Sequence, residues 1–433
     1  MPRLLAVGAA VAATSLAIAA APSALASTPT PYGLTGESLG LRVVGGSMPA
    51  NSGDLAKAVS ACTTLAGVRS TNNSAAVALP GGSGRIGAMS STTWTSRQSD
   101  GTVNRFSQAR VAGITIDNPA THTAALTLSG LVSTSHVWHN ASGYHYSTSM
   151  SASDVKLAGT PVSLPTPKSP ITIPGVATLA MGAMNRAKDT NHAFARIDGL
   201  LLTLQPGSAN PTVLDLASTR AEIDAGATGG VFGGNATAST ISALGGTLTS
   251  SGQPLVSMPC VGTKGKVVQK AVASAPLNSV SAPITLGAAT SSDDGNQYMR
   301  NGQRYATGYE RSSISDVNLG NGALVIKGLT ARANVTRTGR TFNTVTANDN
   351  GTTAGSIVAN GTTVPGLSQL NGKKISIPGG VATLQTSVVQ KIMAGKTVIG
   401  ERVTGLRITL LNAAGQTTTV INLANANLRI KGH

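Results

Sequence analysis

Residues 136–146 hold the densest group of side chains that could do chemistry. Three of the six histidines lie there, and so do three of the twelve aromatic residues. Imidazole nitrogens bind transition metals, so three of them close together suggest a metal site. Successive side chains of a strand point to opposite faces, and His136 and His139 are three residues apart. A hairpin in this segment therefore does not gather all three imidazoles on one face, and we predict no metal site there.

The turn at residues 140–143 allows two registers for this hairpin. A four-residue turn puts Trp138 opposite His145 and leaves His136 on their face. A three-residue turn instead gathers His136, Trp138, Tyr144 and Tyr146. Both registers give an aromatic face, which predicts either a stacking platform for sugar rings or ordinary packing onto the core. The candidate ligand-binding residues of this hairpin are His136, Trp138, Tyr144, His145 and Tyr146.

A second group, near residue 300, alternates basic and aromatic side chains. Its members are Tyr298, Arg300, Arg304, Tyr305, Tyr309 and Arg311. Asn301 and Gly302 are the strongest two-residue turn signal in the chain, and this turn puts Tyr298 opposite Tyr305. The interleaving suits anionic polymers, whereas arginine stems that cover tyrosine rings also suit a half-exposed hairpin. Residues 99–101, flanked by Trp94 and Phe106, give a similar turn signal earlier in the chain.

No motif identifies a catalytic site. Residues 36–40 match the G-x-S-x-G pattern around Ser38, but we expect neither the strand before it nor the helix after it that a hydrolase nucleophile needs. The twelve Asp and four Glu residues lie mostly beside turn residues, where carboxylates bond to backbone amides. Calcium-loop ligands are incomplete, and no glycosidase-type carboxylate pair stands out. We therefore predict no catalytic residue, no metal and no cofactor.

The elements that position these residues are predicted to be strands. The chain has 51 Gly, only 3% aromatic and 11% charged residues, and an apolar share of 41%. This composition suits short β-branched strands joined by Gly, Asn, Ser and Thr turns. Apart from the N-terminus, a helical pattern is confined to residues 54–59. The predicted fold class is all-β.

Five pairs of matching segments, in the same order, divide the chain into two copies of one unit. The clearest is Ile-Thr-Ile-Pro-Gly-Val-Ala-Thr-Leu at 171–179, which returns with one added Gly at 375–384. The others pair residues 86–88 with 286–288, 125–131 with 323–329, 195–204 with 401–410, and 212–217 with 419–424. We predict two tandem homologous β-sandwich-like domains, 32–228 and 240–433, joined by a Gly-rich linker at 229–239.

The two cysteines, Cys62 and Cys260, occupy matched positions in the two copies. In an exported protein they are predicted to form a disulfide. Equivalent residues of two related domains can meet only near their pseudo-two-fold axis, so the bond would fix how the domains pack. The alternative is two free thiols, each buried in its own core.

Residues 1–26 have the features of a helical signal peptide: Arg3, an apolar run, and a small-x-small cleavage pattern at 24–26. We predict an extracellular, secreted chain with no transmembrane anchor in its mature part, because no other stretch has 18 apolar residues. The formal net charge is +16, without a run of five basic residues. This diffuse charge favours anionic cell-wall polymer or polysaccharide as the partner, and no specific nucleic acid.

Three short segments resemble the choice-of-anchor P proteins that Gram-positive bacteria export. They are Pro-Tyr-Gly-Leu-Thr-Gly at 31–36, Met-Pro-Cys-Val-Gly-Thr at 258–263, and the Ile-x-Ile-Pro-Gly phrase before each Val-Ala-Thr-Leu strand. The resemblance implies a secreted or surface-associated β-rich protein with no assigned reaction. We expect a non-enzymatic structural or binding protein that contacts the cell envelope or extracellular anionic polymer. The alternative is a secreted hydrolase of polysaccharide or wall material.

Overall fold

The computed structural model describes residues 27–44, 54–79, 83–118, 121, 123–204, 211–243, 248–251, 254–277, 284–320, 322–339, 343–363, 374–376, 382–411 and 415–432. Every regular element in these ranges is a β-strand, so the predicted all-β fold is confirmed. No helix in this part of the chain is long and apolar enough to cross a membrane. The predicted signal peptide, residues 1–26, lies outside the described residues.

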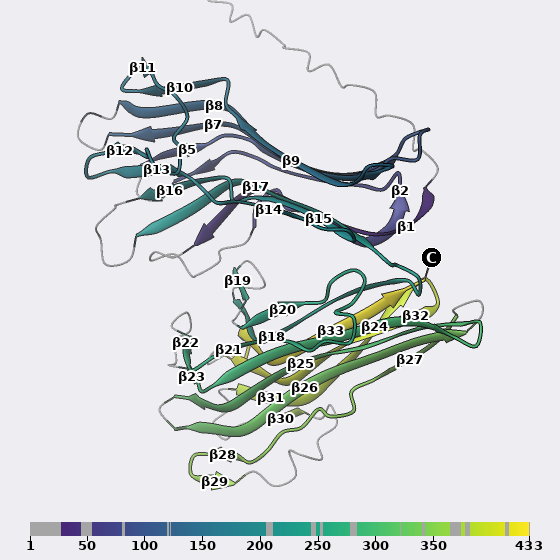
Figure 1. The fold of residues 1–433 in the computed structure, drawn as a ribbon. Helices are drawn as coiled ribbons and strands as arrows, with labels where there is room; N and C mark the ends of the chain where they lie inside the picture. The colour runs from purple at the N-terminus through teal and green to yellow at the C-terminus, as the bar shows by residue number, and fades with distance from the viewer. Residues whose placement is uncertain are drawn as a thin grey trace, which may run out of the picture.

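The first domain is a sandwich of two antiparallel sheets (Figure 1). Sheet 1 contains β1 (Thr28–Val44), β2 (Ala58–Ala66), β12 (Ile171–Ile173), β13 (Ala177–Met181), β14 (Met184–Lys188), β15 (His192–Ile197), β16 (Leu200–Leu204) and β17 (Thr212–Ala225). Sheet 2 contains β3 (Arg69–Ser74), β4 (Val77–Ala78), β5 (Gly84–Ile86), β6 (Met89–Arg97), β7 (Val103–Asp117), β8 (Ala124–Asn140), β9 (Gly143–Ser151), β10 (Asp154–Leu157) and β11 (Thr160–Pro161).

The second domain repeats this arrangement in the order of the chain. Sheet 3 contains β18 (Val231–Ala243), β19 (Leu248–Ser251), β20 (Leu255–Ser257), β30 (Lys374–Ser376), β31 (Ala382–Ala394), β32 (Thr397–Leu411) and β33 (Thr417–Lys431). Sheet 4 contains β21 (Val268–Val272), β22 (Ala275–Leu277), β23 (Ile284–Leu286), β24 (Ala289–Arg300), β25 (Gln303–Leu319), β26 (Leu324–Gly339), β27 (Thr344–Asn348), β28 (Ile357–Ala359) and β29 (Thr362–Thr363).

Alternating side chains build the core of each sandwich. In β6 and β8 nearly every second residue is buried, which leaves one face of sheet 2 inside and the other outside. Ile86 and Leu128 of sheet 2 belong to the same buried cluster as Leu200 and Leu216 of sheet 1. The second sandwich has its own cluster of this kind, drawn from sheets 3 and 4. Each domain therefore has a hydrophobic core of its own, and the outer faces of its two sheets point away from that core.

The segment 229–239, predicted as a linker, is mostly strand β18. Its Phe232 is 1% exposed and pairs with Ile430 of β33, in the middle of sheet 3. A Cβ on Gly234 would lie 2.1 Å from the carbonyl oxygen of Asn427, so this glycine permits close strand packing. The linker prediction is thus corrected: residues 226–230 alone separate β17 from β18, and the Gly-rich composition serves packing rather than flexibility.

Both domains have an irregular backbone at matched points of their long strands. Ala217 in β17 and Ala424 in β33 have positive φ angles of 60° and 50°. At each of them the pairing with the neighbouring strand skips one residue on both strands and resumes in the same register. These alanines belong to the matching segments 212–217 and 419–424. The duplication therefore extends to an irregular detail of the backbone.

Cys62 and Cys260 form the predicted disulfide, with their Cα atoms 5.2 Å apart. The bond joins the domains where β1, β2, β14, β15 and β17 lie on the side of the first domain that is toward the second (Figure 1). A small apolar cluster of Ala227, Val231 and Val261 packs with Cys62. The side chain of Gln297 reinforces the junction, since it accepts a hydrogen bond from the Gly229 amide (2.7 Å) and donates one to the Val261 carbonyl (3.0 Å).

Candidate functional site

The aromatic hairpin adopts the first of its two predicted registers. Asn140 of β8 pairs with Gly143 of β9, and Trp138 stands opposite His145. His136 and Trp138 share the outer face of sheet 2, whereas His139 points to the other face. The three imidazoles are therefore divided between the two faces of the hairpin, as their spacing predicts.

Five rings on the outer face of sheet 2 form one continuous stack. The row runs from Trp94 through Phe106, His136 and Trp138 to His145, with ring centroids 4.7, 3.8, 4.5 and 5.1 Å apart. The planes of neighbouring rings differ by 8–21°. Each of the three rings between the two ends therefore has both faces covered by a neighbouring ring. A sugar stacks on the face of an aromatic ring, so the row argues for cross-strand packing rather than for a sugar platform.

The inner members of this hairpin pack at one end of the sandwich. Tyr144 is 7% exposed and belongs to an apolar cluster with Leu34 and Val137, and Tyr146 packs against this cluster. The Tyr32 hydroxyl lies 2.8 Å from Nδ1 of His139. On the outer face, burial lowers the pKa of His136 to about 4. His136 is thus neutral in the stack, where its Nε2 lies 3.0 Å from Oδ1 of Asn104.

The second predicted group lies at the β24–β25 hairpin of sheet 4. Tyr298 pairs with Tyr305 as predicted, and their rings stack at 5.2 Å with planes 5° apart. Arg300 is exposed next to the turn, while Arg304 is exposed on the opposite side of its strand from Tyr305. The predicted group is therefore divided: Arg304 points away from the face that holds the tyrosines.

Two further arginines complete the outer face of sheet 4. Arg311 of β25 stands directly opposite Arg332 of β26. The Arg332 guanidinium lies 4.1 Å from the ring centroid of Tyr309, and its Nε donates to Oδ1 of Asn334 at 2.8 Å. Among the described residues neither arginine has an ion pair with a carboxylate. Like charges directly opposite each other destabilise a sheet, so the opposition of Arg311 and Arg332 is unfavourable in the free protein.

Positive charge is concentrated in the second domain. Residues 231–433 include 18 Lys and Arg against six Asp and Glu, whereas residues 27–230 include 13 against ten. Three of the six acidic residues, Asp293, Glu310 and Glu401, are no more than 1% exposed. The surface of the second domain therefore carries a larger excess of positive charge than its composition indicates.

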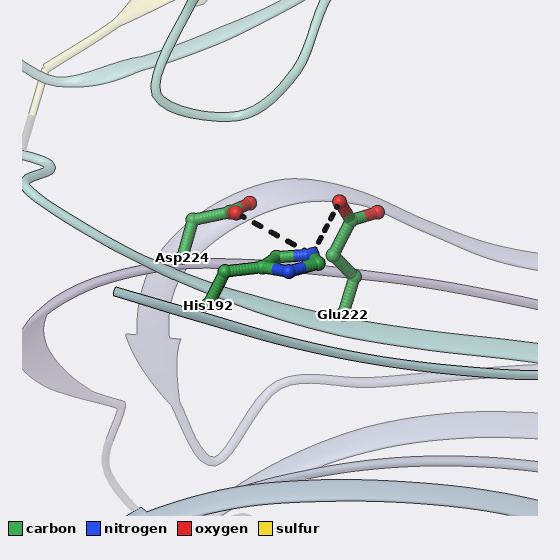
Figure 2. A group of neighbouring side chains, drawn as sticks. All are labelled: His192, Glu222 and Asp224. Atoms are coloured by element: carbon green, nitrogen blue, oxygen red, sulfur yellow. Dashed lines mark hydrogen bonds and ion pairs between the residues drawn. The ribbon is translucent and has the colours of Figure 1, made fainter. Parts of the chain in front are cut away.

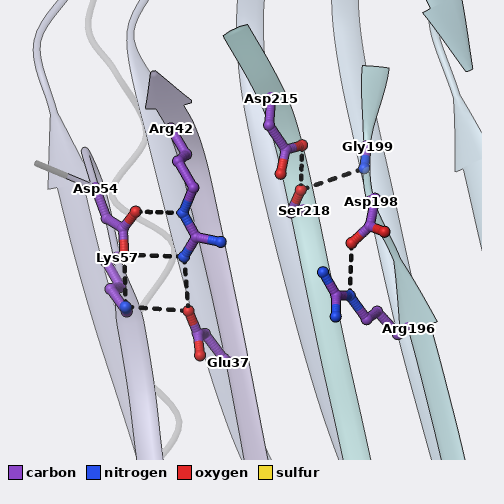
Figure 3. Close-up of polar contacts among 9 residues, drawn as sticks. All are labelled: Glu37, Arg42, Asp54, Lys57, Arg196, Asp198, Gly199, Asp215 and Ser218. Atoms are coloured by element: carbon purple, nitrogen blue, oxygen red, sulfur yellow. Dashed lines mark hydrogen bonds and ion pairs between the residues drawn. The ribbon is translucent and has the colours of Figure 1, made fainter. Parts of the chain in front are cut away.

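In the first domain, acidic side chains on the outer face of sheet 1 are engaged by neighbouring bases (Figure 3). Arg42 bonds to Asp54 at 2.7 Å, and Lys57 bridges Glu37 and Asp54 at 3.1 and 2.5 Å. Burial raises the pKa of Asp215, which accepts a hydrogen bond from Ser218. Ser38, the centre of the G-x-S-x-G pattern, is fully buried in the middle of β1. It is therefore not placed as a nucleophile.

Sequence reasoning missed a cluster of His192, Glu222 and Asp224 on the outer face of sheet 1 (Figure 2). Strand β15 pairs with β17, which sets His192 opposite Asp224 and places Glu222 two residues earlier on the same face. Nε2 of His192 is 3.3 Å from Oε1 of Glu222 and 3.9 Å from Oδ1 of Asp224. No sequence signal marks this cluster, because 29 residues separate His192 from Glu222.

The cluster is electrostatically coupled to its surroundings. Burial raises the pKa of Asp224 to about 7, and the negative charge of Glu222 adds to the effect. The hydrogen bond with Glu222 raises the pKa of His192. Burial alone would raise the pKa of Glu222, but His192 and Arg220 lower it overall. Arg220 donates to the other oxygen of Glu222, Oε2, at 2.6 Å.

These groups are polar, close together and largely buried, the properties expected of a cation site or a proton-sharing cluster. The outer face of sheet 4 instead offers exposed guanidinium and phenol groups, which suit an extended anionic ligand. The two sites belong to different domains. No family model matches this chain, and no curated protein matches it.

Proposed function

We propose that this protein is an exported, non-enzymatic binding protein whose second domain binds an anionic polymer. The binding surface is the outer face of sheet 4 around Tyr298, Tyr305, Arg311 and Arg332. The observation that supports this proposal is that Arg311 and Arg332 lie directly opposite each other, and neither has a carboxylate partner among the described residues. Such an arrangement costs stability in the free protein, and a bound polyanion would offset that cost.

The charge distribution supports a polymeric rather than a small ligand. A surface excess of positive charge attracts polyanions at long range and raises their local concentration. Arg300 and Arg311 are exposed and belong to the strands that form the β24–β25 hairpin, so an extended chain could contact both. The stacked Tyr298 and Tyr305 rings lie between them on the same face. Tyr298, 40% exposed, adds an apolar contact for the polymer backbone.

The resemblance to choice-of-anchor P proteins and the predicted signal peptide support a location at or outside the cell surface. Wall polymers and acidic polysaccharides are the polyanions present there, and we propose them as the natural ligands. The disulfide is consistent with an oxidising compartment. A hydrolase is the weaker proposal, because the buried pair Asp293 and Glu310 is closed off inside the sandwich and Ser38 is buried.

Binding of the full mature chain to two defined polyanions tests the proposal. Polygalacturonate represents acidic polysaccharide and inorganic polyphosphate represents phosphate polymers. We expect wild-type protein to bind both polymers at low salt. The logarithm of its binding constant should fall linearly with the logarithm of the salt concentration. The double variant Arg311→Gln with Arg332→Gln should lose affinity about tenfold and show a shallower salt dependence.

A matched variant removes the same charge from sheet 3, by Arg402→Gln with Arg407→Gln. It should lose clearly less affinity than the sheet 4 variant. Equal losses would refute the assignment to sheet 4, and no binding of wild type at low salt would refute the function. Release of reducing ends in the same tubes would favour the hydrolase. The sheet 4 variant should also unfold at the same or a slightly higher urea concentration, because it relieves the repulsion between Arg311 and Arg332.

A further inference from the structure

We propose that His192, Glu222 and Asp224 form a binding site for one divalent transition metal ion, with Zn²⁺ the best match. This site lies in the first domain and is independent of the polymer-binding surface proposed above. Imidazole nitrogen with two carboxylate oxygens is a donor set suited to Zn²⁺, whereas Ca²⁺ and Mg²⁺ prefer all-oxygen sites. The three donor atoms lie within 4.8 Å of one another.

The distances in the cluster are close to those that a tetrahedral ion requires. Ligands at 2.0–2.2 Å from Zn²⁺ are about 3.3–3.6 Å from each other. Nε2 of His192 is 3.3 Å from Oε1 of Glu222, within that range, and 3.9 Å from Oδ1 of Asp224, slightly beyond it. Both carboxylates point toward the same edge of the imidazole (Figure 2). A rotation of the Asp224 side chain that closes the remaining distances would complete three ligand positions and leave the fourth for water.

An unsatisfied buried oxygen independently points to a missing ligand. Asp224 is 8% exposed, and its Oδ2 has no hydrogen-bond partner and no contact with solvent. A buried carboxylate oxygen without a partner is costly, and most such groups are paired or coordinate a metal. Arg220 engages only Oε2 of Glu222, so Oε1 remains directed at Nε2 of His192. A cation between these groups that also contacts Oδ2 would satisfy Asp224 and relieve its repulsion with Glu222.

Other charged groups near the site set limits on it. Lys264 acts on Asp224 from the second domain, and its positive charge weakens cation binding there. Asp189 has the opposite effect, because its negative charge, which also raises the pKa of His192, favours a cation at the site. The site nonetheless has two carboxylates against one nearby lysine and an Arg220 that is already bonded to Glu222. A divalent ion is therefore the species that best balances its charge.

The second domain contains a natural comparison for this site. By the matching of segments 212–217 and 419–424, Glu222 and Asp224 correspond to Arg429 and Lys431. The same backbone positions therefore carry bases in sheet 3. Because those side chains cannot bind a cation, the chain should hold one ion in its first domain and none at the matched position.

The site also lies beside the junction between the domains. Asp224 pairs with His192 on one side and with Gly33 of β1 on the other. A Cβ on Gly33 would lie 2.7 Å from Cβ of Cys260, so the second domain covers this row of residues at Gly33. A bound ion would thus fasten β15 to β17 next to the disulfide that holds the domains together.

Equilibrium dialysis of the untagged mature protein against ZnCl₂ alone, after removal of metals with EDTA, tests the proposal. We expect about one Zn²⁺ per chain, a higher unfolding temperature, and the visible absorption of tetrahedral Co²⁺ when CoCl₂ replaces zinc. His192→Gln and Glu222→Gln should each abolish the zinc binding and the cobalt absorption. CaCl₂ should cause no comparable shift in unfolding temperature.

His145→Gln and Glu37→Gln are matched controls, since each removes the same kind of side chain elsewhere in the first domain. Both should bind zinc as wild type does. Because Gln keeps a hydrogen-bonding group at 192 and 222, circular dichroism should show that the test variants remain folded. Folded wild-type protein that binds no zinc, or zinc binding that survives both test substitutions, would overturn the proposal.

Discussion

Asp293 and Glu310 are two carboxylic acids that face each other inside the second sandwich. They are 1% and 0% exposed, and none of their four oxygens has a hydrogen-bond partner. Burial raises the pKa of Asp293 to about 6 and that of Glu310 well above its ordinary value. The first domain has Thr93 and Ser107 at the matched positions of β6 and β7, which also pair with each other. We predict that Asp293→Thr stabilises the second domain at neutral pH and leaves its stability nearly unchanged in acid.

The sign and size of this effect follow from the pKa of Asp293. In the unfolded chain the group ionises near 3.8 and in the folded protein near 6. Well below pH 3.8 both states keep the proton, so the group causes no pH-dependent loss of stability. Between pH 4 and 6 the unfolded state loses its proton first, and stability falls as pH rises. Above pH 6 the full loss remains, which is about 3 kcal/mol for a shift of about two pH units.

Urea unfolding at pH 4 and pH 8 measures this prediction. Both tryptophans lie in the first domain, so their fluorescence follows that domain, and circular dichroism follows both. Asp293→Thr should gain about 3 kcal/mol at pH 8 and less than about 1 kcal/mol at pH 4. The control is Asp294→Asn, which changes a carboxylate on the outer face of the same strand and should alter stability little at either pH. An equal gain at both pH values, or none at pH 8, would refute the reasoning.

Two further substitutions test the junction and the ring stack. Replacing Cys62 and Cys260 by Ser should lower the free energy of unfolding by up to about 5 kcal/mol, the chain-entropy value for so long a loop, and unchanged urea unfolding would contradict this. Trp138→Ala removes the stacking of Trp138 with two neighbouring rings and should lower the free energy of unfolding by about 1–3 kcal/mol. The fluorescence of Trp94 measures this unfolding. Trp94→Ala removes one neighbour, and a loss larger than that of Trp138→Ala would be inconsistent with the stack.

Features that depend on neighbouring residues could be predicted from the sequence. A two-residue turn and strict alternation define a hairpin register, and they placed Tyr298 opposite Tyr305 correctly. The turn near residue 140 was ambiguous by one residue, so two registers for Trp138 remained open until the structure selected one. The disulfide was predictable because the repeat put Cys62 and Cys260 at matched points of a chain that is predicted to be exported.

Features that depend on packing between distant strands could not be predicted. Glycine occurs both in flexible linkers and in strands where a neighbouring backbone packs closely, and the sequence does not distinguish the two roles. Gly233 and Gly234 therefore indicated a linker, although they belong to β18. The His192 cluster depends on β15 pairing with β17, although β16 lies between them in the chain. That pairing is decided by how sheet 1 assembles, and no local pattern reports it. The stack of rings likewise needed the order of four strands in sheet 2 before its covered faces could be recognised.

The matched positions of the two copies separate what the fold requires from what function adds. Both copies keep a positive φ at Ala217 and Ala424, so their backbones follow the same course at this point of these strands. Seven residues beyond each of these alanines, however, Asp224 stands in one copy and Lys431 in the other. A backbone that accepts either charge does not explain why each copy holds the one it does. The acidic position in the first domain, where the buried Oδ2 of Asp224 has no hydrogen-bond partner and Oδ1 lies 3.9 Å from Nε2 of His192, is therefore better explained by a ligand than by folding, and metal binding is the direct way to decide it.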